Sequence, residues 1–383
     1  MTKTESSSLE EQVKKIASDE GAVLVGICSA DSIKDKKFSD PNFLLPGAQS
    51  VISIALNQEE ESIKKYLAKE DRDSFCLKSD YINKKLYAIG EKIKIFLEEQ
   101  GFKAFNCKIN FDYRNAKINE TTYRALENFV DLINKQKDEN YHLSKSEQKT
   151  IDALSNMLEI GFKRNKVDFV PEFSHRYAAE AAGLGRIGWS GNIITEKYGA
   201  RIMLTSVITD AKMNPDEPSK ENHCKMCKLC ERVCQGGFFS KGEKEKITVA
   251  GVQEIIGKRN SYSYCAAVCG GFIGQNRFSE WSTWSPYRFE SYGIKSVDTL
   301  PLDETIDDFY QEIMYRAILE GGRKAENVLK MVRTILYGLH NKPKEDYIPT
   351  CGNCQIVCGP TMEDKKKSYN LLKNSGCIEK GEL

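Results

Sequence analysis

Cysteine spacing is the feature that most constrains what this chain can fold into. Nine of its thirteen cysteines lie between positions 224 and 358. The first group has the pattern C-x2-C-x2-C-x3-C and consists of Cys224, Cys227, Cys230 and Cys234. In this pattern the two-residue gaps curl the backbone so that three sulfurs reach three irons of one cube, while the fourth sulfur is carried to another. The pattern therefore predicts that the first three cysteines hold one [4Fe–4S] cluster and that Cys234 crosses to a second.

A second group has the pattern C-x2-C-x3-C and consists of Cys351, Cys354 and Cys358. Two cubes need eight cysteines, and the two groups together contain seven. We assign Cys224, Cys227, Cys230 and Cys358 to one cluster. The other cluster would be held by Cys234, Cys351, Cys354 and one cysteine of the pair between the groups, either Cys265 or Cys269, with Cys265 preferred.

A structural zinc site is the alternative interpretation, because Zn²⁺ also binds four thiolates. Zinc motifs, however, seldom place three cysteines at two-residue spacing with a fourth that crosses away. The spacing therefore favours iron–sulfur clusters. The remaining four cysteines are isolated, and we expect them to be ordinary thiols: Cys28, Cys76, Cys107 and Cys377.

Charge and hydropathy limit the other classes of function. Lys plus Arg number 56 and Asp plus Glu number 55, so the chain has no global basic excess for nucleic acid, although a local patch stays open. The apolar runs have the length of core strands, which predicts no bilayer-spanning segment. The first eleven residues are polar and carry no export signal. We therefore expect a cytoplasmic protein, in which clustered cysteines indicate metal or redox chemistry.

The 383 residues predict two domains, divided where the cysteine-rich part begins. Hydrophobic periodicity predicts helices over 7–20 and 80–100, the second ending before Gly101. Short β-like runs are expected at 22–28, 50–56 and 200–209. The stretch from 120 to 165 is polar and Lys-rich, which predicts a solvated helical or loop insertion.

One segment carries a resemblance to a known group of enzymes. Arg176 to Gly188, RYAAEAAGLGRIG, is similar to the A-x-x-AGLG-x-x-G segment of the cobalamin-dependent reductases, which comprise reductive dehalogenases and epoxyqueuosine reductases. The continuation through Val207–Ala211 and Asp216–Pro218 also looks like that superfamily, and the two cysteine groups follow in its order. The resemblance covers about 168–358. Gln235 and Gly359 depart from it, because these enzymes commonly have proline there.

The resemblance implies an α+β fold with two parts. A nitroreductase-like domain at 1–210, interrupted by the insertion at about 120–165, would bind a corrinoid. A ferredoxin-like domain at 211–383 would hold the two [4Fe–4S] clusters. The residues expected at the corrinoid face are Gly183, Leu184, Gly185, Gly188 and Gly191. For each glycine the alternative is a tight turn around a helix end.

The implied activity is an oxidoreductase that passes low-potential electrons through the clusters to cobalamin. The substrate would be a small molecule, either an organohalide or an epoxyqueuosine-like compound, and tRNA would be a partner only in the second case. A ferredoxin or flavodoxin would be the electron donor. The alternative from another functional class is a two-cluster electron-transfer protein that reduces a partner such as a corrinoid protein. Cobalt uptake distinguishes the two.

Reductive cleavage also needs a proton donor. Val167-Asp168-Phe-Val-Pro171 resembles the VDxxP of epoxyqueuosine reductases, in which the Asp is the proposed donor. Dehalogenases use a Tyr near a basic residue, which makes Tyr177 beside Arg176 a second candidate. His175 is a third, because the ordinary pKa of imidazole lies near neutrality. The alternative for Asp168 is a turn cap before the proline.

Overall fold

A four-stranded antiparallel sheet forms the centre of the protein. The computed structural model describes residues 7–34, 38–107, 120–164, 173–234, 237–260, 264–265, 352–375 and parts of 312–332. The sheet order is β1 (Leu24–Ser29), β2 (Ser50–Asn57), β6 (Ile202–Thr209) and β3 (Ala104–Asn106). Strand β6 pairs with β2 along its whole length, from Ser50 opposite Thr209 to Asn57 opposite Ile202. The three expected strands are therefore present, each beginning within two residues of its predicted start.

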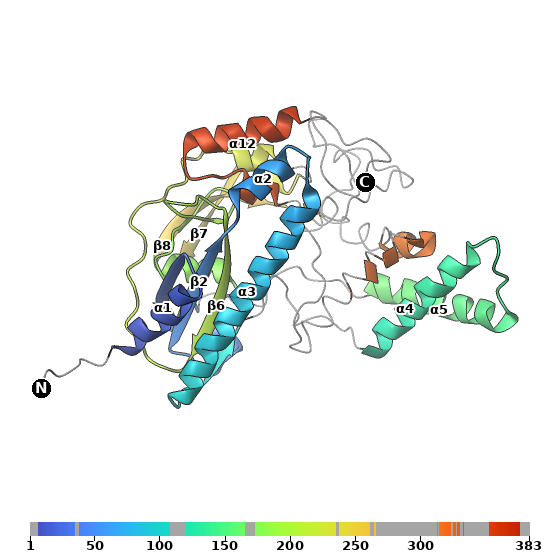
Figure 1. Ribbon diagram of the computed structural model, residues 1–383, viewed down its shortest axis with the longest axis horizontal. Coiled ribbons are helices and arrows are strands. Elements are labelled where there is room, and N and C mark those ends of the chain that lie inside the picture. The colour runs from blue at the N-terminus through green and yellow to red at the C-terminus, as the bar shows by residue number, and fades with distance from the viewer. Residues whose placement is uncertain are drawn as a thin grey trace, which may run out of the picture.

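Alternating side chains of the strands build two separate cores, as the period of a β-strand requires. Helices α1 (Leu9–Asp19) and α3 (Arg72–Glu99) cover one face, over apolar residues such as Ile27, Ile52 and Val207. The opposite face carries another set: Cys28, Val51, Ala55 and Ile208. On that face lie α6 (His175–Ala181) and the hairpin of β7 (Phe239–Val249) and β8 (Val252–Arg259). The result is a layered, mixed α/β architecture (Figure 1).

Helix α3 is longer than periodicity predicted. Its last residue, Glu99, and the left-handed Gly101 after it agree with the expected stop. Its start lies at Arg72 instead of residue 80, because the Asp71 side chain accepts the backbone N–H of Ser74 and caps the helix there. Helix α2 (Glu60–Leu67) precedes it and was not predicted. Short 3₁₀ turns, η1 (Ala30–Ile33) and η2 (Pro41–Phe43), join β1 to β2.

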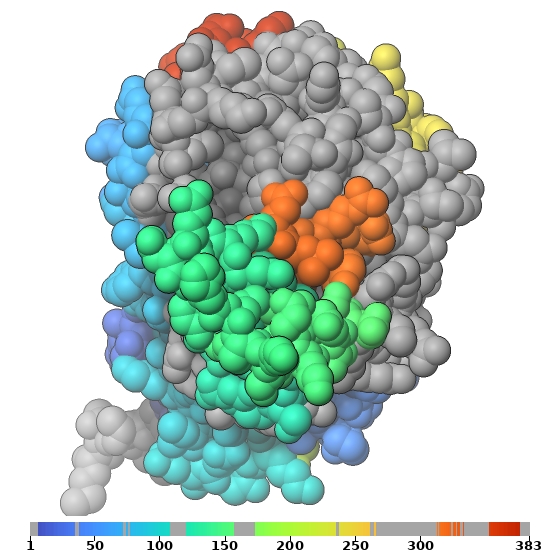
Figure 2. Space-filling view, turned by 90° about the vertical axis from the view of Figure 1, so that its right-hand side faces the viewer, coloured from blue at the N-terminus to red at the C-terminus, as the bar shows by residue number. Residues whose placement is uncertain are grey.

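The polar stretch at 120–165 forms two helices, α4 (Glu120–Gln136) and α5 (Lys145–Arg164). The expectation of a solvated insertion needs correction, because α4 buries one apolar stripe that includes Leu126, Phe129 and Ile133. The Ser155 hydroxyl of α5 lies 2.8 Å from the hydroxyl of Tyr315. Figure 2 shows the two helices together with the described residues of 312–332 on one face of the molecule. The abundance of lysine concealed this stripe in the sequence.

The cysteine-rich segments dock on the sheet through three short elements. These are α7 (Leu229–Arg232), α11 (Asn353–Ile356) and α12 (Met362–Asn374). Ile63 and Leu67 of α2 share an apolar cluster with Ile356 of α11 and Leu372 of α12. Figure 1 shows α2 and α12 side by side. Described residues on both sides of position 210 thus share a core, and the boundary expected there stays a prediction.

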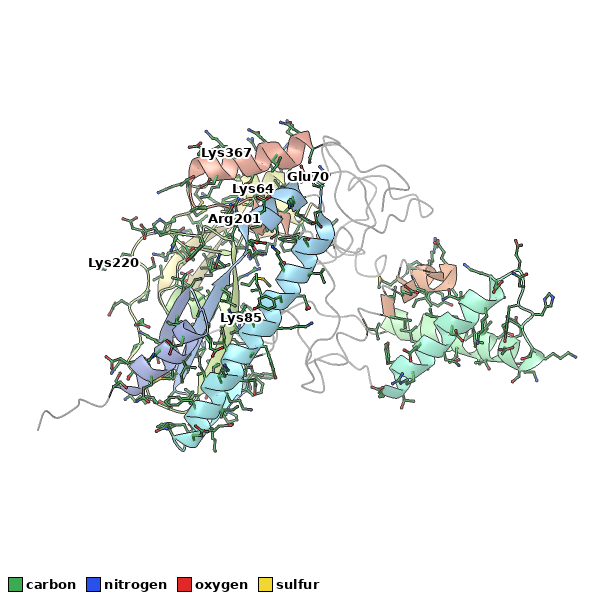
Figure 3. All side chains as sticks on the ribbon, in the orientation of Figure 1. Lys64, Glu70, Lys85, Arg201, Lys220 and Lys367 are labelled. Atoms are coloured by element: carbon green, nitrogen blue, oxygen red, sulfur yellow. The ribbon has the colours of Figure 1, made fainter. Side chains whose placement is uncertain are left out.

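Arg201, at the start of β6, ties these elements together. Its side chain is 5% exposed, and its Nε donates to the carbonyl oxygen of Ile356 at 2.8 Å. Nη1 lies 2.6 and 2.7 Å from the two carboxylate oxygens of Glu60, and Nη2 donates to the Ser368 hydroxyl at 2.6 Å. Figure 3 labels Arg201 below α12 and beside α2. One guanidinium therefore holds α2, α11 and α12 against the sheet.

We expect Arg201→Met to lower the free energy of unfolding by about 2–4 kcal/mol, because it leaves the Ile356 carbonyl without its donor and removes a charge-assisted pair. Urea denaturation of the anaerobic protein measures the change. Arg232→Met is the matched control, since Arg232 is exposed, and should cost less than about 0.5 kcal/mol. Equal losses in the two variants would contradict this role of Arg201.

Candidate metal centre and active site

One pocket collects four of the predicted cluster cysteines. Cys224, Cys227, Cys230 and Cys358 line it together, around about 350 Å³ of empty space that includes a part open to solvent. Cys230 belongs to α7, and Cys358 follows α11. These are the four residues that the spacing assigned to the first cluster. The structure places them together, and their ligation of iron stays a prediction.

Close backbone packing brings Cys358 to the first cysteine group. The N–H of Ala200 donates to the carbonyl oxygen of Cys358 at 2.8 Å. Gly199 lies against the same turn with a left-handed φ of 58°, and a Cβ at this position would collide with the Cys358 carbonyl. Only glycine meets both demands without strain. Gly199 and Ala200, which precede β6, therefore pack closely against the backbone of Cys358.

The donors at this pocket are thiols, which both iron–sulfur clusters and structural zinc sites use. Across the described residues, no three side chains of His, Cys, Asp or Glu are placed to hold one metal ion. The preference for iron–sulfur over zinc therefore rests on the cysteine spacing, and metal analysis distinguishes the two.

A tight hairpin supplies hydrogen-bond donors to the sulfurs. It joins β4 (Arg186–Ile187) to β5 (Ile193–Ile194), and its Trp189 N–H donates to the Sγ of Cys224 at 3.3 Å. On the same loop, Nδ2 of Asn192 lies 4.0 Å from the Sγ of Cys354. Beyond the hairpin, the N–H of Phe238 donates to the Sγ of Cys234 at 3.2 Å. Such donors stabilise thiolate charge and tune cluster potentials.

The glycines expected at a corrinoid face each have a close neighbour from this chain. Gly183 has a φ of 75° and ends α6, where the N–H of Leu184 donates to the Ala179 carbonyl at 2.9 Å. A Cβ at Gly185 would lie 2.6 Å from the Ile194 carbonyl, and one at Gly188 would lie 3.0 Å from the Cys224 Cβ. A Cβ at Gly191 would collide with the Arg259 guanidinium. Turns and close packing thus account for these glycines, and their contact with a corrinoid stays a prediction.

Two of the candidate proton donors lie on α6. His175 is 9% exposed, and its Nδ1 lies 2.9 Å from the Ser206 hydroxyl of the sheet. Tyr177 is half-buried and packs edge-to-face on Phe38, with ring centroids 5.3 Å apart. Burial raises the pKa of the Tyr177 phenol, and the nearby charge of Arg259 lowers it in part. The phenol therefore carries its proton at neutral pH.

Several predicted residues lie outside the described residues: Asp168, Cys269 and Cys351. Cys265 is described and is partly exposed. Leu184 is 7% exposed and packs in the core beneath α6. The roles assigned to these residues stay predictions.

Comparisons with known proteins add sequence relatives of two kinds. A tetrachloroethene reductive dehalogenase of Desulfitobacterium hafniense is 36% identical over 72 residues, which are 18% of this chain and 13% of that protein. An epoxyqueuosine reductase of Bacillus cereus is 27% identical over 207 residues, 54% of this chain and 40% of that protein. The chain is thus similar in sequence to both kinds of reductase, which supports the resemblance seen in its motifs. The matches span less than two thirds of either relative's length.

Two further comparisons complete this result. No protein-family model matches the chain. A solved structure described as a reductive dehalogenase aligns with 99% of this chain and 41% of its own, at 14% identity and a TM-score of 0.44. The similarity to these reductases rests on the sequence relatives alone. None of the described helices has both the length and the apolar character that a membrane crossing requires.

A buried acidic network beside the superfamily's AGLG segment was missed by the sequence analysis. Glu180 is fully buried and accepts the N–H of Ile187 at 2.7 Å. The Nε of Arg186 lies 3.6 Å from the Oε1 of Glu180, and its Nη2 lies 2.5 Å from the Oε1 of Glu254. Burial raises the pKa of Glu180 to about 7. The hydrogen bond from the Ile187 N–H lowers this pKa in part, and the negative charge of Glu254 raises it further. A single sequence does not distinguish a buried glutamate from one on a helix surface.

The raised pKa of Glu180 makes stability depend on pH. Between its ordinary value of 4.5 and about 7, the folded chain keeps a proton that the unfolded chain has released. Stability should therefore fall as pH rises through this window. Glu180→Gln removes the titration and keeps an acceptor for Ile187, so its stability should change less across the window. Urea denaturation at several pH values measures both slopes.

Glu245→Gln is the control, because Glu245 is exposed. It should keep the slope of the parent protein. A Glu180→Gln slope equal to the parent slope would show that Glu180 does not titrate in this window.

Proposed function

We propose that this chain is a corrinoid-dependent reductase that passes low-potential electrons through two [4Fe–4S] clusters to cobalamin. The substrate would be an organohalide or an epoxyqueuosine-like compound, cleaved or deoxygenated by reduction. The observation that carries the proposal is the pocket at which Cys358 joins Cys224, Cys227 and Cys230. Sequence relatives of both reductase kinds support the same reaction class.

The chemistry of the four donors fits an iron–sulfur cluster. Soft thiolate ligands suit iron–sulfur clusters. Burial raises the pKa of Cys358 to about 12, and it raises that of Cys230, where the other cysteines add to the effect. Without a cation these thiols stay protonated, so assembly must release their protons. A cationic cluster core would compensate the charge of the four thiolates.

The surrounding residues hold the sulfurs and limit their access to water. Cys230 is 8% exposed, and the hairpin that contains Trp189 covers Cys224. The same hairpin contacts Cys224 through Trp189 and Cys354 through Asn192, so the second cysteine group lies close to the first. Two clusters held in this way would be near neighbours, which favours rapid electron transfer between them. When bound, the clusters supply single electrons and the corrinoid supplies reducing chemistry at cobalt.

The two-part organisation belongs to the same proposal. Residues 1–210 would form the nitroreductase-like corrinoid domain, and residues 211–383 the ferredoxin-like domain. A ferredoxin or flavodoxin would supply the electrons. The partner would be tRNA only if the substrate is epoxyqueuosine.

An electron-transfer protein without a corrinoid is the second candidate. The packing of the four glycines favours it, because Gly183, Gly185, Gly188 and Gly191 each have a neighbour from this chain that explains a missing side chain. In this case the clusters would serve a partner such as a corrinoid protein. Cobalt binding separates the two functions.

Metal analysis of the anaerobically reconstituted protein is the decisive experiment. We expect about eight irons per chain, two interacting cluster signals in EPR, and about one cobalt per chain after incubation with cobalamin. Bound zinc without iron would exclude both functions. Eight irons without cobalt would leave only the electron-transfer function.

Single variants assign the irons within this experiment. Cys227→Ala should lose the cluster of the described pocket, whereas Cys234→Ala should spare it. Cys28→Ala is the control, since Cys28 lies in β1 and outside the pocket, and should keep all the iron.

Asp168 remains our first choice of proton donor. A general acid contributes roughly 10²–10⁴-fold, so Asp168→Asn should lower turnover by about that factor while iron and cobalamin stay bound. Tyr177→Phe keeps the ring that packs on Phe38 and should lower turnover by less than about tenfold, below the range expected for loss of a general acid. Turnover is measured with whichever substrate class the protein accepts. If Tyr177→Phe shows the large loss of turnover and Asp168→Asn does not, Tyr177 is the proton donor.

A further inference from the structure

A buried lysine lies at the pocket of the four cysteines. Lys365 is 2% exposed and is among the largest fully buried side chains of the described residues. It lines the same pocket as Cys224, Cys227, Cys230 and Cys358. Burial of an ammonium group is costly unless a negative group compensates its charge. Its place in the pocket therefore calls for a negative partner.

The position of Lys365 in its helix adds to this cost. Its backbone N–H donates to the Thr361 carbonyl at 3.1 Å, so it lies at the end of the first turn of α12. A cation near a helix N-terminus is opposed by the helix dipole. A neutral residue at this position would make the folded protein more stable, so the positive charge of Lys365 indicates a role other than stability.

Within the described part of the chain, the ammonium group of Lys365 has one hydrogen bond and no carboxylate partner. Its Nζ donates to the carbonyl oxygen of His223 at 3.4 Å, and that oxygen is neutral. Arg201 offers a contrast, because its guanidinium is buried nearby but is paired with both oxygens of Glu60. The charge of Lys365 acts instead on the pocket, where it favours the thiolate of Cys358.

We propose that Lys365 is the charge partner of the cluster held by Cys224, Cys227, Cys230 and Cys358, and that it raises the reduction potential of this cluster. The inference rests on the proposed function. A cube with four thiolates is anionic and gains one further negative charge on reduction, so a fixed positive charge nearby favours the reduced state. Net charge near the sulfurs is one of the determinants of cluster potential.

The other lysines at the pocket are less suited to this role. Lys225 is exposed, and Lys228 is partly exposed with its ammonium 4.4 Å from the centre of the Trp189 ring. Water and salt screen charges in such positions. Lys365 is buried, so water and salt screen its charge less than they screen the charges of Lys225 and Lys228.

Lys365 also joins the two cysteine groups, which suggests a purely structural role as the competing explanation. It follows Cys358 on α12 and bonds the residue before Cys224. A structural lysine would be needed for iron binding, whereas a charge partner would set the potential of a cluster that still assembles. The reduction potential separates the two roles.

The test is an EPR-monitored redox titration of the anaerobic, reconstituted full chain. The cluster signal to follow is the one that Cys227→Ala removes. Lys365→Gln keeps a donor for the His223 carbonyl but loses the charge, and Lys365→Arg keeps both. Lys366→Met is the matched control, because it removes an exposed charge from the adjacent position of the same helix.

We expect Lys365→Gln to weaken the preference of this cluster for its reduced form at least about tenfold, which is a fall of about 59 mV for a one-electron couple. Iron content should stay at the parent level. Lys365→Arg should keep the parent potential more closely than Lys365→Gln does, and Lys366→Met should leave it nearly unchanged.

Two results would overturn the inference. One is a Lys365→Gln potential no lower than that of Lys366→Met, which would show that the charge does not reach the cluster. The other is loss of iron from Lys365→Gln, which would make Lys365 a structural residue. Absence of any cluster from the parent protein would instead refute the proposed function, so the two failures are distinguishable.

Discussion

The guanidinium of Arg201 is the interaction on which the geometry of the four-cysteine pocket depends. It fixes α2 through Glu60, α11 through the Ile356 carbonyl and α12 through Ser368. The residue before it, Ala200, holds the carbonyl of Cys358. Because both residues lead into the central strand β6, the position of the last cysteine is set by the sheet itself. Cys358, far from β6 in sequence, is therefore positioned by the residue that leads into the central strand.

The sheet and the cysteine groups could be predicted because their signals are local. The strands at 50–56 and 200–209 are apolar runs of the right length, and thiol spacing within a few residues indicates how sulfurs curl around a pocket. The partnership of Cys358 with Cys224, Cys227 and Cys230 was also assigned from spacing, and the structure places these four together. The strands are thus confirmed, whereas the binding of metal by these cysteines stays a prediction.

Other features could not be predicted because long-range packing creates them. Helix α2 is short and acquires its role from apolar contacts with α11 and α12, which lie near the other end of the chain. The β7–β8 hairpin reads as a charged, Lys- and Glu-rich run, and only Val249 and Ile256 reveal that it packs beneath α6. The burial of Glu180 and Lys365 has no sequence signature, since charged residues on helices are usually solvated. For these residues the surroundings, and not their own neighbours in sequence, decide what they do.

The order of the strands has a consequence for how the protein is made. Strand β2 pairs along one of its edges with β6. The ribosome synthesises β6 roughly 150 residues after β2, and Cys358 roughly 150 residues after β6. Synthesis proceeds at about 5–20 residues per second. During this interval Cys224, Cys227 and Cys230 have emerged, but the turn that closes their pocket does not yet exist. A growing chain thus presents three thiols without their fourth companion, a state open to oxidation or to capture of the wrong metal. If the pocket holds a cluster, iron insertion is best suited to a chain from which Cys358 and α12 have both emerged.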